Sequence, residues 1–269
     1  MAMDKIAVID LGGQYAHLIA NRVRRLGVYS EIVDNTTRAA DLKKYKGIIL
    51  SGGPQSVYAK NSPQIDPAIL KLGIPVLGIC YGHQLIVQAL GGKVNQGTAK
   101  EYGIAKLNVM KKEGILRGLP AVTTVWMSHG DEVSRLPKGF EEIGNSIDAH
   151  YSVVADLKKK LYGVQFHVEV THTKHGIAML KNFLKICRVR KSWNMESFLK
   201  TEMEKTRAQV GGKKVFMLVS GGVDSLVAFT LLNKAIGPQN VYGLFVDTGF
   251  MRLDEGVEVK RALAKLKFK

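Results

Sequence analysis

The chain has 269 residues, with 39 Lys and Arg against 23 Asp and Glu, and a formal net charge of +16. This length allows one large domain or two ordinary ones, and the apolar content of 46% is ordinary for a soluble globular protein. Two cysteines, Cys80 and Cys187, exclude a disulfide framework. No signal peptide pattern is present, and no apolar run reaches the roughly 18 residues of a membrane span, so we expect a cytoplasmic protein without membrane contact.

The positive charge is spread along the chain rather than gathered in one segment. Residues 188–269 hold 15 basic and 8 acidic residues, a net +7, so +9 of the +16 falls on residues 1–187. No basic run is interleaved with aromatic residues, as a single-strand groove would require. We therefore expect no nucleic-acid partner, since a few local cations would serve a nucleotide substrate equally well.

The first segments alternate between strands and helices. Residues 5–10 are a continuous apolar run that predicts a buried strand, and residues 15–26 carry a helical apolar stripe. Residues 29–33 and 47–50 predict two further strands. This order predicts an α/β fold with a doubly wound, mostly parallel sheet, whose ligands bind beyond the carboxyl ends of the strands.

Two glycine-rich segments follow strands and should lie at that edge. Ser51-Gly52-Gly53-Pro54 comes directly after the third strand, where a glycine pair lets backbone N–H groups approach a ligand. Alone, this segment is equally typical of a plain turn. Its interest comes from the second segment, which follows the next predicted strand, residues 75–79.

That second segment has the pattern of a nucleophile elbow. Cys80 stands between Gly78 and Gly82, and a helix is expected from His83 to about Leu90. Strand, Gly-x-Cys-x-Gly and helix form the thiol counterpart of Gly-x-Ser-x-Gly, with a helix N-terminus that favours the thiolate. A buried structural cysteine is the alternative, but the pattern favours Cys80 as a nucleophile.

The next segments predict an antiparallel flap beside the main sheet. Residues 104–110, 122–127 and 152–156 read as its strands. A polar cluster, residues 127–131, follows the second of them and is either a surface turn or a place for substrate contacts.

A further strand is expected over residues 162–169, and it carries His167 and Glu169. Positions two apart lie on one face of a strand, so the carboxylate can hold the imidazole while its other nitrogen faces a nucleophile. A lone strand histidine is usually structural, but the upstream elbow favours a catalytic pair. A helix over residues 177–186 would close a domain of residues 1–187.

A linker with a connecting helix, residues 188–212, leads to a second α/β unit over residues 213–269. Its first strand, residues 213–219, runs into Ser220-Gly-Gly-Val-Asp-Ser225 and then a helix, which predicts an anion cradle of N–H and hydroxyl groups. Another strand is expected over residues 241–246. One βαβ unit cannot bury both faces of its strands, so this domain is expected to be incomplete.

These motifs together resemble a known enzyme family. Gly78-Ile-Cys-Tyr-Gly-His-Gln84 with Gln165-Phe-His-x-Glu169 resembles class I, triad-type glutamine amidotransferases. Trp126-Met-Ser-His-Gly-Asp131 and Ser220-Gly-Gly-Val-Asp-Ser225 in one chain resemble the glutamine-hydrolysing GMP synthase family, in which an amidotransferase is fused to an ATP-pyrophosphatase domain.

For the first half, the resemblance implies glutamine hydrolysis. Cys80 would attack the side-chain amide, His167 would shuttle protons and Glu169 would orient His167. The backbone N–H groups of Gly53 and Tyr81 would form the oxyanion hole. The glutamine-binding residues would be Gly52, Gln84, Ser128 and His129.

For the second half, the resemblance implies ATP with Mg²⁺, the ion being held through the phosphates rather than by a protein cage. The backbone of Val246 would meet the adenine. Adenylated XMP would then receive the ammonia to give GMP. The ATP loop would consist of Ser220, Gly221, Gly222, Val223, Asp224 and Ser225.

Two departures from the family pattern stand out. Val168 occupies the position between His and Glu where the family usually has Pro. The remainder of the ATP-pyrophosphatase domain and the family's dimerisation domain are missing, so we expect this chain alone to supply only the glutaminase half. The alternatives are a glutaminase subunit of another ATP-dependent amidotransferase and a catalytically silent, nucleotide-sensing module.

Overall fold

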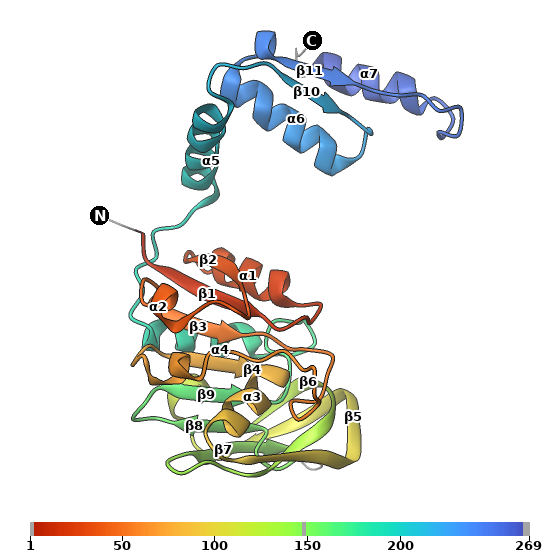
Figure 1. Cartoon of the computed structure of the whole chain (residues 1–269). Coiled ribbons are helices and arrows are strands. Elements are labelled where there is room, and N and C mark those ends of the chain that lie inside the picture. The colour runs from red at the N-terminus through yellow and green to blue at the C-terminus, as the bar shows by residue number, and fades with distance from the viewer. Residues whose placement is uncertain (1–2, 147–148, 266–269) are drawn as a thin grey trace. The chain divides into compact units, whose positions relative to one another are not determined.

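The computed structural model describes residues 3–146 and 149–265 (Figure 1). Backbone contacts divide the chain into two compact units, Met1–Trp193 and Asn194–Lys269. Residues 188–193, expected in the linker, belong to the first unit, where the backbone N–H of Trp193 donates to the carbonyl of Gly27 at 3.1 Å. The expected connecting helix belongs to the second unit.

The first unit is built on one sheet, which has nine strands within the described residues, in the order β2-β1-β3-β4-β9-β8-β7-β5-β6. The strands are β1 (Lys5–Asp10), β2 (Tyr29–Asp34), β3 (Gly47–Leu50), β4 (Val76–Ile79), β5 (Lys93–Val109), β6 (Val122–Arg135), β7 (Glu141–Ser146), β8 (Val153–Asp156) and β9 (Leu161–Val164). The helices are α1 (Ala16–Arg25), α2 (Ala39–Leu42), α3 (Tyr81–Ala89) and α4 (Gly176–Ile186). The predicted α/β fold class is confirmed for this unit.

Apolar side chains cover both faces of the sheet. In β1, Ile6 and Val8 face one core, which also contains residues of α1 and α4. Ala7 and Ile9 face a second core, which contains residues of α2 and α3. Alternate residues of a strand point to opposite faces, so a strand buried on both sides must be apolar throughout. This explains the continuous apolar runs in the sequence.

The antiparallel strands extend the main sheet instead of forming a separate flap. Strands β2, β1, β3, β4 and β9 are mutually parallel, and β9, β8, β7, β5 and β6 continue as antiparallel neighbours. Strands β5 and β6 are 17 and 14 residues long, far beyond the predicted 104–110 and 122–127. The sequence analysis also missed β7. The polar cluster 127–131 therefore lies within β6. Its backbone hydrogen bonds to β5 hold it in a strand although most of its side chains are polar.

The strand predicted over residues 162–169 was also too long. Strand β9 ends at Val164, and residues 165–170 lie in bends and irregular backbone. Alternation on a strand is therefore not the reason that His167 and Glu169 meet.

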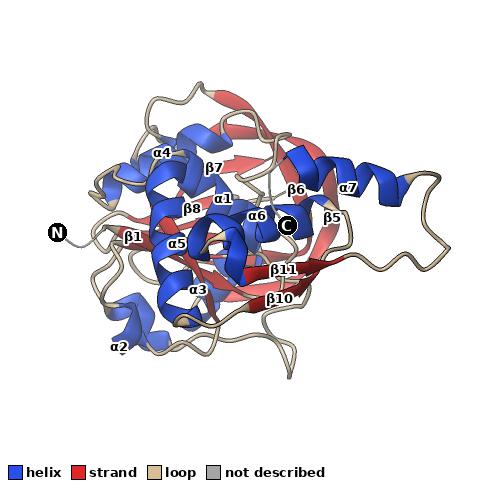
Figure 2. Ribbon diagram, turned by 90° about the horizontal axis from the view of Figure 1, so that it is seen from above, coloured by secondary structure: helices blue, strands red, loops and turns tan. Residues whose placement is uncertain are grey.

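The second unit is small. Its strands β10 (Val215–Leu218) and β11 (Val241–Leu244) run parallel and side by side (Figure 2). Its helices are α5 (Met195–Val210), α6 (Val223–Ile236) and α7 (Glu255–Lys265). Three buried residues form its core: Val219, Phe229 and Val241. Both strands are shorter than predicted.

Among the described helices of the chain, none has the length and apolar character to cross a membrane.

Candidate active site

The carboxyl ends of β1, β3, β4 and β9 are tied together by hydrogen bonds. The hydroxyl of Ser51, just after β3, accepts from the N–H of Leu11 at 2.9 Å. The carbonyl of Ser51 accepts from Gly82 at 3.1 Å, and the N–H of Cys80 donates to Val164 at 2.7 Å. The predicted glycine segment and cysteine segment therefore meet at one sheet edge.

Cys80 makes a sharp turn between β4 and α3. Its φ of 52° and ψ of −107° are unusual for a residue with a side chain and cost about 1–3 kcal/mol. Helix α3 begins at Tyr81, two residues earlier than predicted, so Cys80 stands directly at its N-terminus.

The glycines on both sides of Cys80 are required by close backbone contacts. A Cβ at Gly78 would lie 2.4 Å from the carbonyl oxygen of Gly82. A Cβ at Gly82 would lie 2.6 Å from the carbonyl oxygen of Leu50. Both positions therefore exclude any side chain, which supports the elbow predicted from the sequence.

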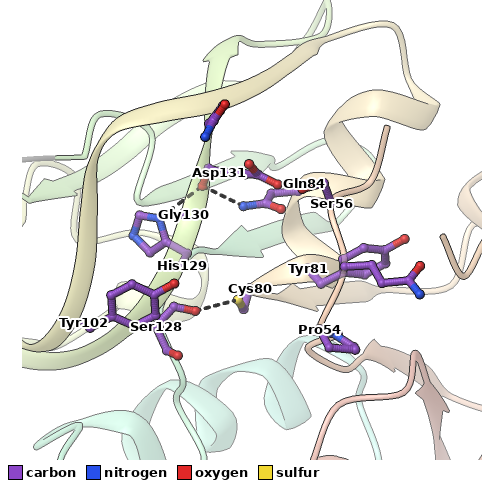
Figure 3. A pocket seen from close by; sticks show the side chains of 13 residues that line it. Pro54, Ser56, Cys80, Tyr81, Gln84, Tyr102, Ser128, His129, Gly130 and Asp131 are labelled. Atoms are coloured by element: carbon purple, nitrogen blue, oxygen red, sulfur yellow. Dashed lines mark hydrogen bonds between the residues drawn. The ribbon is translucent and has the colours of Figure 1, made fainter. Parts of the chain in front are cut away.

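The thiol of Cys80 opens onto a pocket of about 390 Å³ (Figure 3). Its Sγ donates to the carbonyl oxygen of Ser128 at 3.6 Å, and the residue is 7% exposed. The predicted site residues that line this pocket are Gly53, Cys80, Tyr81, Gln84, Ser128 and His129. Gly52 lies beside it, since a Cβ there would be 3.1 Å from Cε1 of His167 and 3.8 Å from Cβ of Cys80.

His167 and Glu169 form the predicted pair, although they do not share a strand. Nδ1 of His167 lies 2.7 Å from Oε1 of Glu169, and both residues are buried. Thr173 holds the bend: its hydroxyl donates to the carbonyl of His167 at 2.5 Å and accepts from the N–H of Trp126 at 3.1 Å. The N–H of His167 donates to Trp126 at 3.0 Å.

The surroundings of His167 favour its charged form. Burial by itself lowers the pKa of this imidazole, but the contacts with Cys80 and Glu169 outweigh burial and raise the pKa to about 10. Because Nδ1 faces Glu169, Nε2 is the nitrogen left for Cys80. A protonated imidazole beside a thiol stabilises the thiolate, as nucleophilic catalysis by cysteine requires.

Gln84 is fixed by two acceptors. Its Nε2 donates to the carbonyl oxygen of Asp131 at 2.9 Å (Figure 3). The same Nε2 donates to Oε1 of Gln165 at 3.1 Å. Asp131 also lines the pocket, and its carboxylate accepts from the hydroxyl of Tyr58 at 2.9 Å. The sequence analysis assigned no role to Gln165, Tyr58 or the Asp131 carboxylate. Asp131 had a signal as the last residue of the polar cluster, and Gln165 had one as the first residue of the motif Gln165-Phe-His-x-Glu169.

The glutamine amidotransferase class-I family matches residues 7–187. The chain belongs to this family. The match reaches every strand of the sheet and contains the complete Cys80, His167 and Glu169 arrangement.

The chain is 52% identical over 262 residues to a Leptospira interrogans protein named probable GMP synthase (glutamine-hydrolyzing), covering 96% of this chain and 43% of that protein. It is 50% identical over 254 residues to a Staphylococcus epidermidis GMP synthase (glutamine-hydrolyzing), covering 93% of this chain and 49% of that protein. The chain thus spans less than half the length of these curated relatives. A solved Thermoplasma acidophilum protein, assigned provisionally as one subunit of a GMP synthase, is 34% identical, with a TM-score of 0.63 over 70% of this chain and 96% of its own.

The second cysteine of the chain is not among the residues that line the pocket. Cys187 follows α4 and is buried against Gly47, where an added Cβ would lie 2.3 Å from its sulfur. Burial raises the pKa of the Cys187 thiol. Buried structural thiols of this kind are inert in general, so we expect no reaction at Cys187.

The predicted ATP loop, Ser220 to Ser225, follows β10 and includes the first three residues of α6, which begins at Val223. The hydroxyl of Ser220 donates to the hydroxyl of Ser225 at 3.2 Å and accepts from the N–H of Gly222 at 3.4 Å. Gly221 has φ +84°, and a Cβ there would lie 2.5 Å from Val259. Hydroxyls and N–H groups at the N-terminus of a 14-residue helix are a donor set that fits phosphate. Val246 lies two residues beyond β11 and is 53% exposed.

Proposed function

We propose that this chain hydrolyses glutamine to glutamate and ammonia. The observation that carries the proposal is Cys80 at a strained elbow, with its thiol opening onto a pocket and the buried pair of His167 and Glu169 beside it. Both curated relatives described above have "glutamine-hydrolyzing" in their names, which supports the same reaction.

The first half of the reaction forms a thioester. His167 takes the proton of Cys80 on Nε2, and Sγ attacks the side-chain amide carbon of glutamine. The N–H of Tyr81 lies in the first turn of α3, where no intrahelical acceptor exists, so it can donate to the oxyanion together with Gly53. His167 then protonates the amide nitrogen, the C–N bond breaks and ammonia leaves.

The second half returns the enzyme to its starting state. A water molecule gives its proton to His167, and its oxygen attacks the thioester carbon. The C–S bond breaks, glutamate leaves and the thiolate regains a proton from His167. Glu169 keeps Nδ1 of His167 engaged throughout, so that each proton passes through Nε2.

The pocket residues hold glutamine. Gln84, Ser128 and His129 lie around the opening to Cys80, and Gly52 lets the backbone come close to the reacting atoms. These residues present amide, carbonyl and imidazole groups, which are the hydrogen-bonding partners that an uncharged carboxamide needs.

The ammonia is used in the ATP-dependent amination of XMP to GMP. The names of the curated relatives support this acceptor, and the loop from Ser220 to Ser225 would hold the phosphates of ATP with Mg²⁺. Val246 would meet the adenine through its backbone. The resemblance to the GMP synthase family further suggests a cytoplasmic protein whose complete form is a homodimer.

The test is ammonia release from glutamine by the full chain. Cys80→Ser should abolish it, and Cys187→Ser, which alters the buried sulfur outside the pocket, should retain it. Release that persists in Cys80→Ser would overturn the proposal. A parent chain that releases no ammonia, alone or with an added synthetase, would favour the silent nucleotide-sensing alternative. Ammonia release with transfer to an acceptor other than XMP would favour another ATP-dependent amidotransferase.

A further inference from the structure

Gln165 lies at the centre of a buried hydrogen-bond chain that ends at the nucleophile. It directly follows β9 and is 2% exposed. Its backbone N–H donates to the carbonyl of Ser152 at 2.9 Å. Its side-chain Nε2 lies 3.9 Å from Sγ of Cys80, within the range of a hydrogen bond to sulfur.

The neighbours of Gln165 decide which end of its amide faces Cys80. Oε1 of Gln165 accepts from Nε2 of Gln84 at 3.1 Å. The same Nε2 of Gln84 donates to the carbonyl of Asp131, so the Gln84 amide presents its nitrogen to two acceptors. An amide has an acceptor end and a donor end, so fixing the oxygen of Gln165 toward Gln84 directs its NH₂ group to Cys80.

The two protonation states of Cys80 need different partners. The thiol can donate a hydrogen bond, and the carbonyl oxygen of Ser128 at 3.6 Å accepts it. The thiolate has no proton to donate and is repelled by that carbonyl oxygen. A hydrogen bond from a neutral donor to an ionised acceptor is about twice as strong as one between neutral groups. The NH₂ group of Gln165 is such a donor.

We propose that Gln165 is a catalytic residue of this site, which donates a hydrogen bond to Sγ of Cys80 once the thiol proton has moved to Nε2 of His167. Gln84 positions the amide of Gln165 for this contact. The proposal rests on the proposed glutaminase function for its place in the reaction, and it deepens that function. The side-chain amide of Gln165 thereby connects Gln84, which holds glutamine in the proposed function, to Cys80.

The same contact links substrate binding to the nucleophile. A shift of the Gln84 amide on glutamine binding moves the amide of Gln165 that it orients. The hydrogen bond from Gln165 to the thiolate changes with it. The titratable groups that face Cys80 or the pocket from the surrounding elements are His167, Glu169, Tyr81, Tyr102, His129 and Asp131. All of these remain in the variants used below, so they contribute equally to each measurement.

The test is the rate at which iodoacetamide alkylates Cys80 in the full chain as a function of pH. The thiolate attacks the carbon, the S–C bond forms and iodide leaves, so the rate reports the thiolate fraction, and peptide mass spectrometry assigns it to Cys80. Gln165→Glu has nearly the same shape but brings a carboxylate toward the thiolate. We expect about 10-fold slower alkylation at neutral pH and a midpoint raised by about one pH unit. Gln165→Met, which removes the donor, should shift the midpoint in the same direction.

Gln88→Glu is the matched control. Gln88 lies on the exposed side of α3, so this variant has the same change in net charge without a contact to Cys80. Its alkylation profile should match that of the parent. A second variant, Gln84→Met, leaves Gln165 in place but removes the group that orients it, and should give a smaller shift in the same direction. Thermal unfolding of each variant shows whether it has kept its fold.

An alkylation profile for folded Gln165→Met and Gln165→Glu that coincides with the parent would overturn the inference. So would an equal shift in Gln88→Glu. Alkylation needs no glutamine, which separates the two proposals. A parent that releases no ammonia, but whose alkylation still depends on Gln165, would overturn the proposed function and support the contact.

Discussion

At the scale of single residues, the elbow depends on backbone atoms that are too close for any side chain. The Cβ of an alanine at position 82 would lie 2.6 Å from the carbonyl oxygen of Leu50. Backbone atoms cannot move away as a flexible side chain can, so β3 and α3 would have to separate. Cys80, the proposed nucleophile, lies at the N-terminus of α3, and activity should therefore fall together with stability.

We expect Gly82→Ala to lower the free energy of unfolding by about 1–3 kcal/mol or more and to abolish most glutaminase activity. Gly91→Ala is the comparison. Gly91 has φ +87°, but no atom lies within 4 Å of a Cβ added there. This variant should therefore lose only the about 1–2 kcal/mol of an unfavourable backbone conformation and should remain active. Urea unfolding and ammonia release measure both. Equal activity in the two variants would contradict the role of close packing at the elbow.

The pKa of His167 makes a prediction about stability. Burial lowers this pKa, but Cys80 and Glu169 raise it to about 10, well above the value of about 6.5 for an unfolded histidine. A raised pKa means that the folded state binds the proton more tightly. The resulting stabilisation is complete below about pH 6.5 and is lost as the pH rises toward 10.

The difference in unfolding free energy between the parent and His167→Gln should therefore be largest near pH 6 and shrink by pH 10. Urea unfolding at pH 6, 8 and 10 measures it. His17→Gln, at an exposed position of α1, is the control for the loss of an imidazole away from Cys80 and Glu169. A difference for His167→Gln that is constant over this range would contradict the assigned pKa.

At the scale of elements, the segment after β9 is held against β6 rather than forming a strand of its own. Thr173 bonds to Trp126 and His167, and the N–H of Lys174 donates to the carbonyl of Thr124 at 3.1 Å. These bonds fix the bend that brings His167 and Glu169 together. Val168, in the position where Pro is usual in the family, is 1% exposed and packs in the core, so its side chain does not enter the pocket.

Thr173→Val keeps the shape of the side chain and removes both hydrogen bonds. We expect a loss of about 1–3 kcal/mol in stability, because two buried groups lose their partner, and a lower kcat with little change in KM. Thr124→Val is the control, since the Thr124 hydroxyl accepts only a surface contact from Lys106 at 3.1 Å. A change confined to KM would instead place Thr173 in glutamine binding.

At the scale of the whole molecule, the two units differ in how much apolar surface they bury. The first has extensive cores on both faces of its sheet. The second has a core cluster of three buried apolar residues. Phe216 and Leu218 on β10 are 65% and 64% exposed, and Tyr242 and Leu244 on β11 are 50% and 46% exposed. A small unit with so little burial is marginally stable.

We therefore expect residues 194–269 to be cleaved by protease before residues 1–193, and Mg-ATP to bind this chain weakly or undetectably. A phosphate loop needs a packed strand and helix to hold its N–H groups rigidly. Limited proteolysis and calorimetric titration with Mg-ATP are the measurements. Micromolar binding by an intact, protease-resistant chain would contradict this expectation.

Local sequence patterns determined most of the elements and the elbow at Cys80. The strands over residues 5–10 and 47–50 were predicted with the observed bounds, and the helix Met195–Val210 lies within the segment 188–212 that was predicted to contain it. Apolar periodicity indicates which side of a segment is buried. Glycines on both sides of a cysteine indicate a sharp turn, because a side chain at either glycine would clash. Both kinds of information lie within a few neighbouring residues.

Tertiary structure alone decided how the site residues meet. His167 and Glu169 were paired correctly, but on a strand that ends at Val164; a bend held by Thr173 brings them together instead. The length of β6 and the contact between Gln165 and Cys80 were not predicted. The physical reason is that these features depend on partners 48 to 85 positions away, such as Ser128 and Gln165 around Cys80, and no local pattern records which distant strand end will lie beside another.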